Sequence, residues 1–341
     1  MDENLNAAVL GAGSWGTALA KLLADNGHRV RLWCRRTEQA EAIEAARENE
    51  AYLPGFRLPD DLHATSDLEG ALDGVGLILS VVPTHGLRAV LEQAKDLFPA
   101  DAPVLSCTKG IEQESLLMVS GVFEAHLPAD RHHLLTYLAG PSFAREVAAR
   151  MPTAVTVAGH DEKVAHRVQH HLRNPSMRVY TTDDVVGAEL GGALKNVIAI
   201  AAGVGDGLGF GHNARAAIIT RGLAEIGRLG AKMGAHPMTV HGLAGMGDLV
   251  LTCTGDLSRN RKVGLALGAG QKLADILAGM NMVAEGVKTT KSAHELALRE
   301  GVEMPITAAM YKILYEDQDP KLMVTELMTR AARKERDDHH E

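Results

Sequence analysis

The segment Gly11-Ala12-Gly13-Ser14-Trp15-Gly16 constrains the fold of this chain more than any other part of its sequence. An apolar run at 7–10 predicts a buried strand before it, and residues 17–24 have the composition and spacing of a helix. In this context the first glycine permits a tight turn, the second admits a pyrophosphate, and the third lets helix and strand pack closely. The helix start also offers N–H groups to phosphates.

The motif therefore predicts a dinucleotide site, and a glycine-rich turn without a ligand is the alternative. The glycines expected to contact the cofactor are Gly11, Gly13 and Gly16.

The first half of the chain alternates short apolar runs with helical patterns, which is typical of βαβ units around a parallel sheet. Thr37 is expected to cap a helix that reaches Asn49, and residues 52–61 are expected to form a loop. A further helix is expected from 84 to about 98. Further strands are expected at 29–34, 75–82, 103–108, 134–138, 153–158 and 177–181.

The pattern changes near Asp183, after which no further strand is expected. We therefore predict an α/β fold class: a Rossmann-type, doubly wound sheet at 1–185 followed by an all-α substrate and catalytic domain at 186–330. The charged tail at 331–341 is expected to fray. Helices of the second domain are expected at 185–203, 213–233, 258–268, 272–278, 288–299 and 305–315.

Composition excludes several classes of protein. The net charge of −8 gives no general attraction to nucleic acid or anionic membranes. Cys34, Cys107 and Cys253 lie far apart, which predicts neither a metal site nor a disulfide framework and fits the reducing cytoplasm. The N-terminus has no features of a signal peptide. The longest apolar run, 197–204, is too short to span a bilayer, so no stable membrane insertion is expected.

Three further points of the sequence follow strands of the predicted sheet, where ligands of such folds bind. Arg35 and Arg36 stand where an NAD site usually carries an acidic residue, which favours the 2′-phosphate of NADP(H) and leaves NAD(H) possible. A solvated arginine pair is the alternative. Lys109 could pair with a phosphate or carboxylate, and Gly140 and Ser142 belong to the third of these turns.

Lys195 is a candidate proton carrier. On a helix it would be the only charge on a face of small residues, and a buried lysine shifts its pKa readily. A lysine whose side chain reaches solvent is the alternative. The small neighbours at three- and four-residue steps are Ala188, Gly191, Gly192, Ala199 and Ala202.

Two later segments carry polar residues at turns. Asp248 ends a glycine-rich turn that starts at Gly242, so it is either a functional acid or a helix cap. Ser258 can cap a helix whose first turn holds three cations, Arg259, Arg261 and Lys262. Because the helix dipole disfavours cations there, this start predicts a phosphate site; a basic helix start without a ligand is the alternative.

These motifs together closely resemble the NAD(P)-dependent glycerol-3-phosphate dehydrogenase family of the bacterial, soluble type. The resemblance covers nearly the whole chain. It rests on GAGSWGTALA at 11–20, SCTKGIE at 106–112, AGPSFAREV at 139–147, ELGGALKNVIAIAAG at 189–203, GLAGMGDLVLTC at 242–253, SRNRKVG at 258–264 and VAEGVKT at 283–289.

The resemblance implies a helical domain of the 6-phosphogluconate-dehydrogenase type and interconversion of dihydroxyacetone phosphate with sn-glycerol 3-phosphate, which feeds glycerophospholipid synthesis. It implies that Lys195 is the proton acceptor. The implied substrate contacts are Lys109, Gly140, Ser142, Lys195, Asp248, Ser258, Arg259 and Asn260. The implied cofactor contacts are Ser14, Trp15, Arg35, Arg36, Lys109, Ala144, Arg259, Val283 and Glu285. We expect a small-molecule substrate, no nucleic-acid partner and a homodimer.

Two other functions remain open from the residues. A β-hydroxyacid dehydrogenase would share the architecture and a catalytic lysine, but its carboxylate substrate would leave the basic residues at 258–262 without a purpose. A non-catalytic NADP sensor would need neither Lys195 nor Asp248. Activity on dihydroxyacetone phosphate would separate the first, and cofactor oxidation under any substrate would exclude the second.

Overall fold

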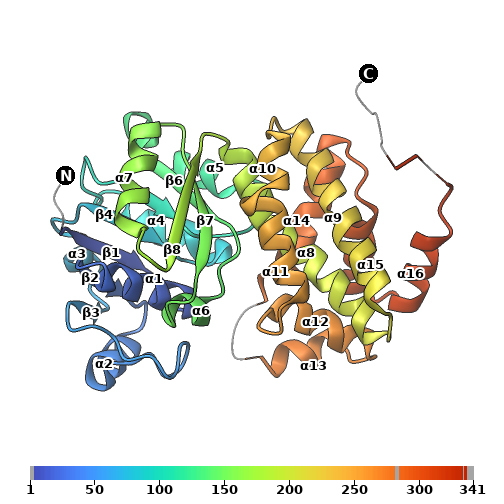
Figure 1. Cartoon of the computed structure of the whole chain (residues 1–341), viewed down its shortest axis with the longest axis horizontal. Helices are drawn as coiled ribbons and strands as arrows, with labels where there is room; N and C mark the ends of the chain where they lie inside the picture. Colours follow the sequence, from blue (N-terminus) through green and yellow to red (C-terminus); the bar gives the residue numbers. More distant parts are fainter. Residues whose placement is uncertain (1–3, 281–283, 333, 336–341) are drawn as a thin grey trace.

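The computed structural model describes residues 4–280, 284–332 and 334–335, and it has an α/β part followed by a helical part (Figure 1). Eight strands form one sheet in the order β3-β2-β1-β4-β5-β6-β7-β8. Neighbouring strands are parallel except β6 and β7, which are antiparallel. The strands are β1 (Asn6–Leu10), β2 (Arg29–Trp33), β3 (Leu62–Thr65), β4 (Leu77–Ser80), β5 (Val104–Ser106), β6 (Leu135–Ala139), β7 (Thr153–Ala158) and β8 (Met177–Thr182).

Apolar side chains cover both faces of this sheet, as a parallel sheet between helices requires. Ala7 and Val9 of β1 belong to one buried cluster, whereas Ala8 and Leu10 belong to another. This alternation follows from the two-residue period of a strand. The helices of this part are α1 (Ser14–Asp25), α2 (Thr37–Ala46), α3 (Leu68–Leu72), α4 (Thr84–Ala94), α5 (Val119–Glu124), the 3-10 helix η1 (Ala129–Leu134), α6 (Ala144–Ala148) and α7 (Glu162–Leu172).

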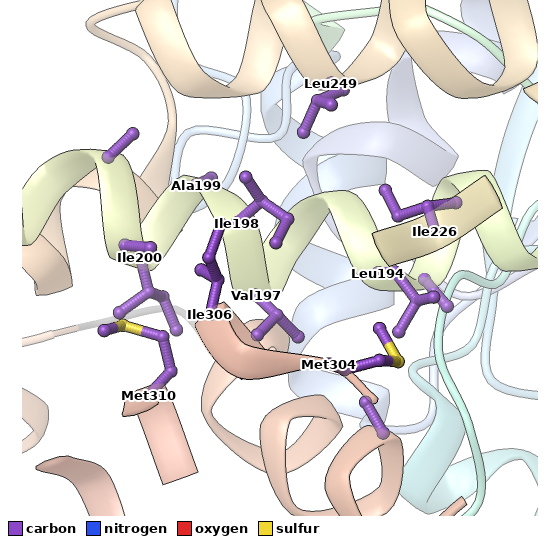
Figure 2. Packing of buried hydrophobic residues seen from close by; sticks show 14 of the residues in the cluster. Leu194, Val197, Ile198, Ala199, Ile200, Ile226, Leu249, Met304, Ile306 and Met310 are labelled. Carbon is purple, nitrogen blue, oxygen red and sulfur yellow. The ribbon is translucent and has the colours of Figure 1, made fainter. Parts of the chain in front are cut away.

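The helical part is built around α8 (Val185–Gly207), whose side chains are buried on nearly every side. Figure 2 shows Val197, Ile198 and Ile200 of α8 close to Ile306 and Met310, all within one hydrophobic cluster. The remaining helices are α9 (His212–Lys232), α10 (Pro237–His241), the π-helix η2 (Leu243–Gly247), α11 (Asp248–Thr254), α12 (Arg259–Gly268), α13 (Leu273–Ala278), α14 (Glu285–Glu300), α15 (Pro305–Tyr315) and α16 (Pro320–Met328).

Helix α8 is long and apolar enough to cross a membrane by length and composition, yet 89% of its most apolar 18-residue window is buried inside the protein. The expectation considered only the uninterrupted apolar run 197–204, whereas any 18-residue window of α8 also includes Lys195 and the apolar residues before it. The observed burial is that of a central core helix.

The topology brings the predicted turns together. The strand order reverses between β1 and β4, and in such sheets ligands bind beyond the carboxyl ends of the strands at that point. The turns that begin at Gly11, Arg35, Lys109 and Gly140 follow β1, β2, β5 and β6, which run in the same direction.

Some local expectations were wrong. Thr37 does not cap α2; Arg36 occupies the cap position, and the Thr37 hydroxyl donates to Ser66 Oγ at 3.0 Å. This helix ends at Ala46 instead of Asn49, because Arg47 adopts a left-handed conformation with φ of 52°. Strand β3 and helix α7 were not expected, although Asp161 caps α7 by accepting from the N–H groups of residues 163 and 164.

Candidate active site

The glycine turn has the geometry that a dinucleotide cradle needs. Gly11 has φ of +113°, and a Cβ there would lie 2.7 Å from the carbonyl oxygen of Val81, which follows β4. A Cβ at Gly16 would overlap the carbonyl oxygen of Gly11, so helix and turn pack without side chains between them. By contrast, no atom lies within 4 Å of the position of a Cβ at Gly13, where the turn faces open space. The three glycines thus have the separate backbone surroundings that the motif predicts.

The surroundings of this turn also fit a bound dinucleotide. No side chain caps α1, and the first N–H groups of a helix have no partners within it. The indole N–H of Trp15 is buried and has no hydrogen-bond partner in the part of the chain that the structure describes. Trp15 and Ala144 pack against the same small apolar cluster, which places both predicted cofactor residues beside the turn.

Two side chains that sequence reasoning missed hold the turn in place. Gln39 Nε2 and Asn49 Nδ2 donate to the carbonyl oxygen of Ala12 at 2.7 and 3.0 Å. Asn49 also donates to Thr17 Oγ1 at 2.7 Å. No sequence motif marks Gln39 or Asn49, because both come from a segment 27 or more residues away from the turn.

Arg35 and Arg36 lie beyond β2, and both side chains are exposed. Arg36 is the N-cap residue of α2, but its side chain forms no capping hydrogen bond with the helix. Guanidinium groups in this place can pair with a phosphate through charge-assisted hydrogen bonds.

The centre of the site is a carboxylate between two lysines. Asp248 Oδ1 accepts from Lys195 Nζ at 2.5 Å, and its Oδ2 accepts from Lys109 Nζ at 2.6 Å. Lys109 follows β5, whereas Lys195 comes from α8 and Asp248 begins α11. The three residues therefore join the sheet to the helical part, although successive members are 86 and 53 positions apart in the sequence. Asp248 does not N-cap α11, because Gly247 occupies that position.

Burial controls the charges of this triad. Asp248 is 1% exposed and Lys195 is 8% exposed. Burial lowers the pKa of Lys195 to about 8; Asp248 opposes this change and Lys109 adds to it. Burial alone would raise the pKa of Asp248, but the two ammonium groups outweigh it and hold this pKa below its usual range. A lysine with a pKa near 8 can both give and take a proton near neutral pH.

The small-residue face around Lys195 contacts other backbone. A Cβ at Gly191 would lie 2.9 Å from the Cα of Gly245 in η2, so α8 and η2 touch through their main chains. Gly192 lies beside the Lys109 stem, since a Cβ at this glycine would lie 3.5 Å from Lys109 Cγ. The expected close approach therefore exists, and it brings η2 and Lys109 to the side of α8 that carries Lys195.

The turn after β6 contributes main-chain oxygen to the same place. Gly140 has φ of +117°, and its carbonyl oxygen accepts from Ser142 Oγ at 3.1 Å and from Lys109 Nζ at 3.4 Å. Gly140 and Ser142 are thus brought to Lys109, as their shared edge of the sheet led us to expect.

Two polar residues at the start of α12, Ser258 and Asn260, form hydrogen bonds within the protein. Ser258 caps the helix by accepting from the N–H of Arg261 at 3.2 Å, as expected. Asn260 Nδ2 donates to Asn196 Oδ1 at 2.8 Å, and Asn260 Oδ1 accepts from the N–H of Gly286 at 2.9 Å. The Asn260 amide thereby connects three helices, α8, α12 and α14. Sequence reasoning did not identify Asn196.

The three cations of that first turn have different surroundings. Arg261 forms ion pairs with Asp206 and Asp256, whereas Arg259 and Lys262 are exposed. Glu285, the first residue of α14, lies near this group: burial raises the pKa of its carboxyl, and Arg259 acts in the opposite direction. Val283, another predicted cofactor contact, lies outside the described residues.

The fold and the site together define a two-domain dehydrogenase that depends on a nicotinamide dinucleotide. Two family models specify the chain further. The model described as the NAD-dependent glycerol-3-phosphate dehydrogenase N-terminus matches residues 6–165, and the model of the C-terminus of the same family matches residues 184–325. The chain belongs to this family, so the resemblance inferred from its motifs is confirmed.

Individual relatives agree with the family models. A glycerol-3-phosphate dehydrogenase [NAD(P)+] of Syntrophotalea carbinolica is 54% identical over 98% of this chain and 100% of its own length. The relative of Geobacter sulfurreducens with the same description is 55% identical over 96% of this chain and 98% of its own length. The crystal structure of glycerol-3-phosphate dehydrogenase from Coxiella burnetii has a TM-score of 0.91 at 42% identity, covering 96% of this chain and 99% of its own.

Proposed function

We propose that Lys195 carries the proton in the interconversion of dihydroxyacetone phosphate and sn-glycerol 3-phosphate. The observation that supports this assignment is the buried Lys195–Asp248–Lys109 triad, with a lysine whose pKa lies near 8. Reduction of a ketone places negative charge on its oxygen, and a general acid is needed beside it. The Lys195 ammonium, which is buried between the sheet and the helical part, can fill this role.

Each member of the triad has its own task in the proposal. NADPH or NADH, when bound, supplies the hydride. Lys195 Nζ gives its proton to the keto oxygen during reduction and takes it back in the reverse direction. Asp248 orients the ammonium and keeps it protonated below pH 8, while Lys109 adds positive charge that favours the developing oxyanion.

The phosphate of the substrate belongs at the start of α12. A helix start with an exposed arginine attracts phosphate through its N–H groups and its charge. The residues proposed to hold the substrate are Lys109, Gly140, Ser142, Lys195, Asp248, Ser258, Arg259 and Asn260. Because both polar atoms of the Asn260 side chain already bond within the protein, its contribution requires that one of these bonds be exchanged.

The cofactor belongs in the glycine turn, and the family uses NADP(H) and NAD(H). We propose that Arg35 and Arg36 make NADP(H) the preferred form. The other residues proposed to contact it are Gly11, Gly13, Ser14, Trp15, Gly16, Lys109, Ala144, Arg259, Val283 and Glu285.

The cellular setting is also part of the proposal. We infer a cytoplasmic enzyme that supplies glycerophospholipid synthesis, acts as a homodimer and has no nucleic-acid partner. The division of the chain at 185/186 and the fraying of the tail at 331–341 stay predictions; residues 333 and 336–341 of this tail lie outside the described residues.

The direct test is the absorbance of NADPH after dihydroxyacetone phosphate is added. We expect oxidation of NADPH with formation of sn-glycerol 3-phosphate. 3-Hydroxypropionate with NADP+, a β-hydroxyacid substrate, should give no comparable rate. A protein that oxidises NADPH only with the oxidised form of a β-hydroxyacid would contradict the proposed substrate class.

A further inference from the structure

Helices α8 and α12 touch through glycines on both sides. On α8 the contact is made by Gly203 and Gly207, and on α12 by Gly264 and Gly268, with the same spacing of four residues. A Cβ at Gly203 would overlap the carbonyl oxygen of Arg261, and a Cβ at Gly264 would overlap that of Ile200. Because the closest atoms are main-chain atoms, the two helix backbones are in direct contact, which sets the separation of their axes at its lower limit.

An ion pair between Asp206 and Arg261 opposes sliding of α8 and α12 along each other. Asp206 of α8 accepts through Oδ2 from Arg261 Nε at 2.9 Å, and Arg261 Nη2 lies 2.8 Å from the same oxygen. Asp206 Oδ1 accepts from Arg215 of α9. The Asp206 side chain is 8% exposed, so this paired carboxylate is well shielded from solvent.

A hydrogen bond attaches the first turn of α12 at a second point. Asn196, which follows Lys195, accepts from Asn260, which follows Arg259. The start of α12 is therefore held by α8 through one bond beside Lys195, in the middle of α8, and through one ion pair near the C-terminal end of α8. These two attachments and the main-chain contact oppose sliding or tilting of α12 against α8.

We propose that Asp206 and the glycine contact between α8 and α12 are positioning elements that set the distance from Lys195 to the phosphate-holding start of α12, and so select a short ketone phosphate. The inference rests on the proposed function. A ketone oxygen must reach Lys195 Nζ while the phosphate of the same molecule lies at α12. A rigid separation therefore accepts only one number of bonds between the two groups, since small misplacements are costly in catalysis.

The variant Asp206→Asn tests the ion pair, because it removes the negative charge that Arg261 and Arg215 share while it keeps the size of the side chain. We expect the KM for dihydroxyacetone phosphate to rise by about tenfold to a hundredfold, with a smaller effect on kcat. The pH dependence assigned to Lys195 should stay as in the parent. The preference for dihydroxyacetone phosphate over its homologue with one more methylene between ketone and phosphate should decrease.

Asp256→Asn is the matched control. Asp256 also pairs with Arg261, at 3.1 Å, but its side chain is 97% exposed and it lies outside the helices that form the contact. Pairs of this kind contribute little. We expect parental KM and selectivity from this variant.

A binding measurement without cofactor separates spacing from loss of the phosphate site. For Asp206→Asn, calorimetry should show weaker binding of sn-glycerol 3-phosphate but parental binding of inorganic phosphate, which needs only the start of α12. Asp206→Glu, which keeps the charge on a longer side chain, provides a variant that retains the ion pair if Asp206→Asn fails to fold, and it should change selectivity in the same direction.

Folded Asp206 variants with parental KM, selectivity and glycerol-phosphate binding would overturn the inference. So would equal weakening of inorganic phosphate and sn-glycerol 3-phosphate, because it would mean that the phosphate site itself was lost. A parent protein that does not turn over dihydroxyacetone phosphate would instead contradict the proposed function, so the two failures are distinguishable.

Discussion

Lys195 shows how neighbouring groups set the chemistry of one residue. Burial lowers its pKa to about 8, and without Asp248 the pKa would fall further, because that carboxylate is the main group that opposes the shift. Lys109 shares the same carboxylate and makes the protonated state less favourable. The result is an ammonium that is mostly protonated at neutral pH and can still release its proton.

We predict that Lys195→Met keeps the fold and NADPH binding but reduces turnover by roughly two to four orders of magnitude, the usual contribution of general acid–base catalysis. In the parent, ketone reduction needs the protonated lysine, so the rate of reduction should fall as the pH rises through about 8. The rate of sn-glycerol 3-phosphate oxidation should increase over the same range, because that direction needs the neutral lysine. Steady-state rates across this range are the measurement. Lys232→Met, at the exposed end of α9, is the control. Turnover within a few-fold of the parent and an unchanged profile would leave Asp248 or a water as the proton source.

A second prediction concerns Arg35 and Arg36. Replacing both by glutamine should raise the KM for NADPH by about tenfold or more, since each charge-assisted hydrogen bond contributes about 1.5–3 kcal/mol. The KM for NADH should change little, because NADH has no 2′-phosphate. Arg29→Gln, at the exposed opposite end of β2, is the control. Equal losses for the two cofactors would show that the arginines support the structure instead.

At the scale of elements, helices and strands with a strong local sequence pattern were predicted correctly. The strand at 153–158 and the helix at 305–315 were predicted with their observed bounds, and Ser258 caps α12 as expected. Strand β3 was missed because its sequence LHAT lacks the continuous apolar run that marked β4, another strand of four residues. The residues of the glycine turn and Lys195 were found by motif. Asn49, which bonds to Ala12, and Asn196, which bonds to Asn260, were not found, since long-range contacts leave no local pattern.

The π-helix η2 has no sequence signature of its own, yet it ends directly before Asp248. A Cβ at Gly245 would lie 2.7 Å from the carbonyl carbon of Val240 and would push η2 away from α10. We predict that Gly245→Ala costs about 1–3 kcal/mol of stability, as overpacking does, and displaces Asp248 from Lys195. With less help from this carboxylate, the pKa of Lys195 should fall, and ketone reduction should lose rate at a lower pH than in the parent.

Thermal unfolding and a pH series of the reduction rate test this prediction. Gly227→Ala on α9 is the control, because no atom lies within 4 Å of its Cβ position. A Gly245→Ala protein that is less stable but keeps the parental pH profile would show that η2 does not determine the position of Asp248.

At the scale of the whole molecule, the sheet separates two groups of ionisable residues. The site lies beyond the carboxyl ends of β1, β5 and β6, whereas His28, His170 and His171 gather near the amino end of β1. His28 Nδ1 accepts from the N–H of Leu5, which precedes β1. The His28 and His171 rings are 5.1 Å apart at their centroids. This histidine group connects the start of the sheet to the end of α7, far from any proposed catalytic step.

His171 makes the fold sensitive to acid. It is 5% exposed, and its Nδ1 has no hydrogen-bond partner among the described residues. Burial lowers its pKa to about 4, and the nearby His28, His170 and Arg167 add to the effect. An unfolded histidine has a pKa of about 6.5, so the unfolded chain binds a proton between these values that the folded protein does not. Folding stability should therefore be unaffected by His171 above pH 6.5 and should decline as the pH falls from 6.5 toward 4.

We predict that His171→Leu reduces this decline, because leucine fills the buried place and takes up no proton in either state. One proton of difference corresponds to about 1.4 kcal/mol per pH unit, so urea unfolding at pH 7.5, 6 and 5 can resolve the change in slope. His133→Leu, at an exposed histidine of η1, should leave the slope as it is in the parent. If His171→Leu loses stability in acid as steeply as the parent, the acid sensitivity comes from other groups, with His28, whose pKa burial also lowers, the next to be replaced.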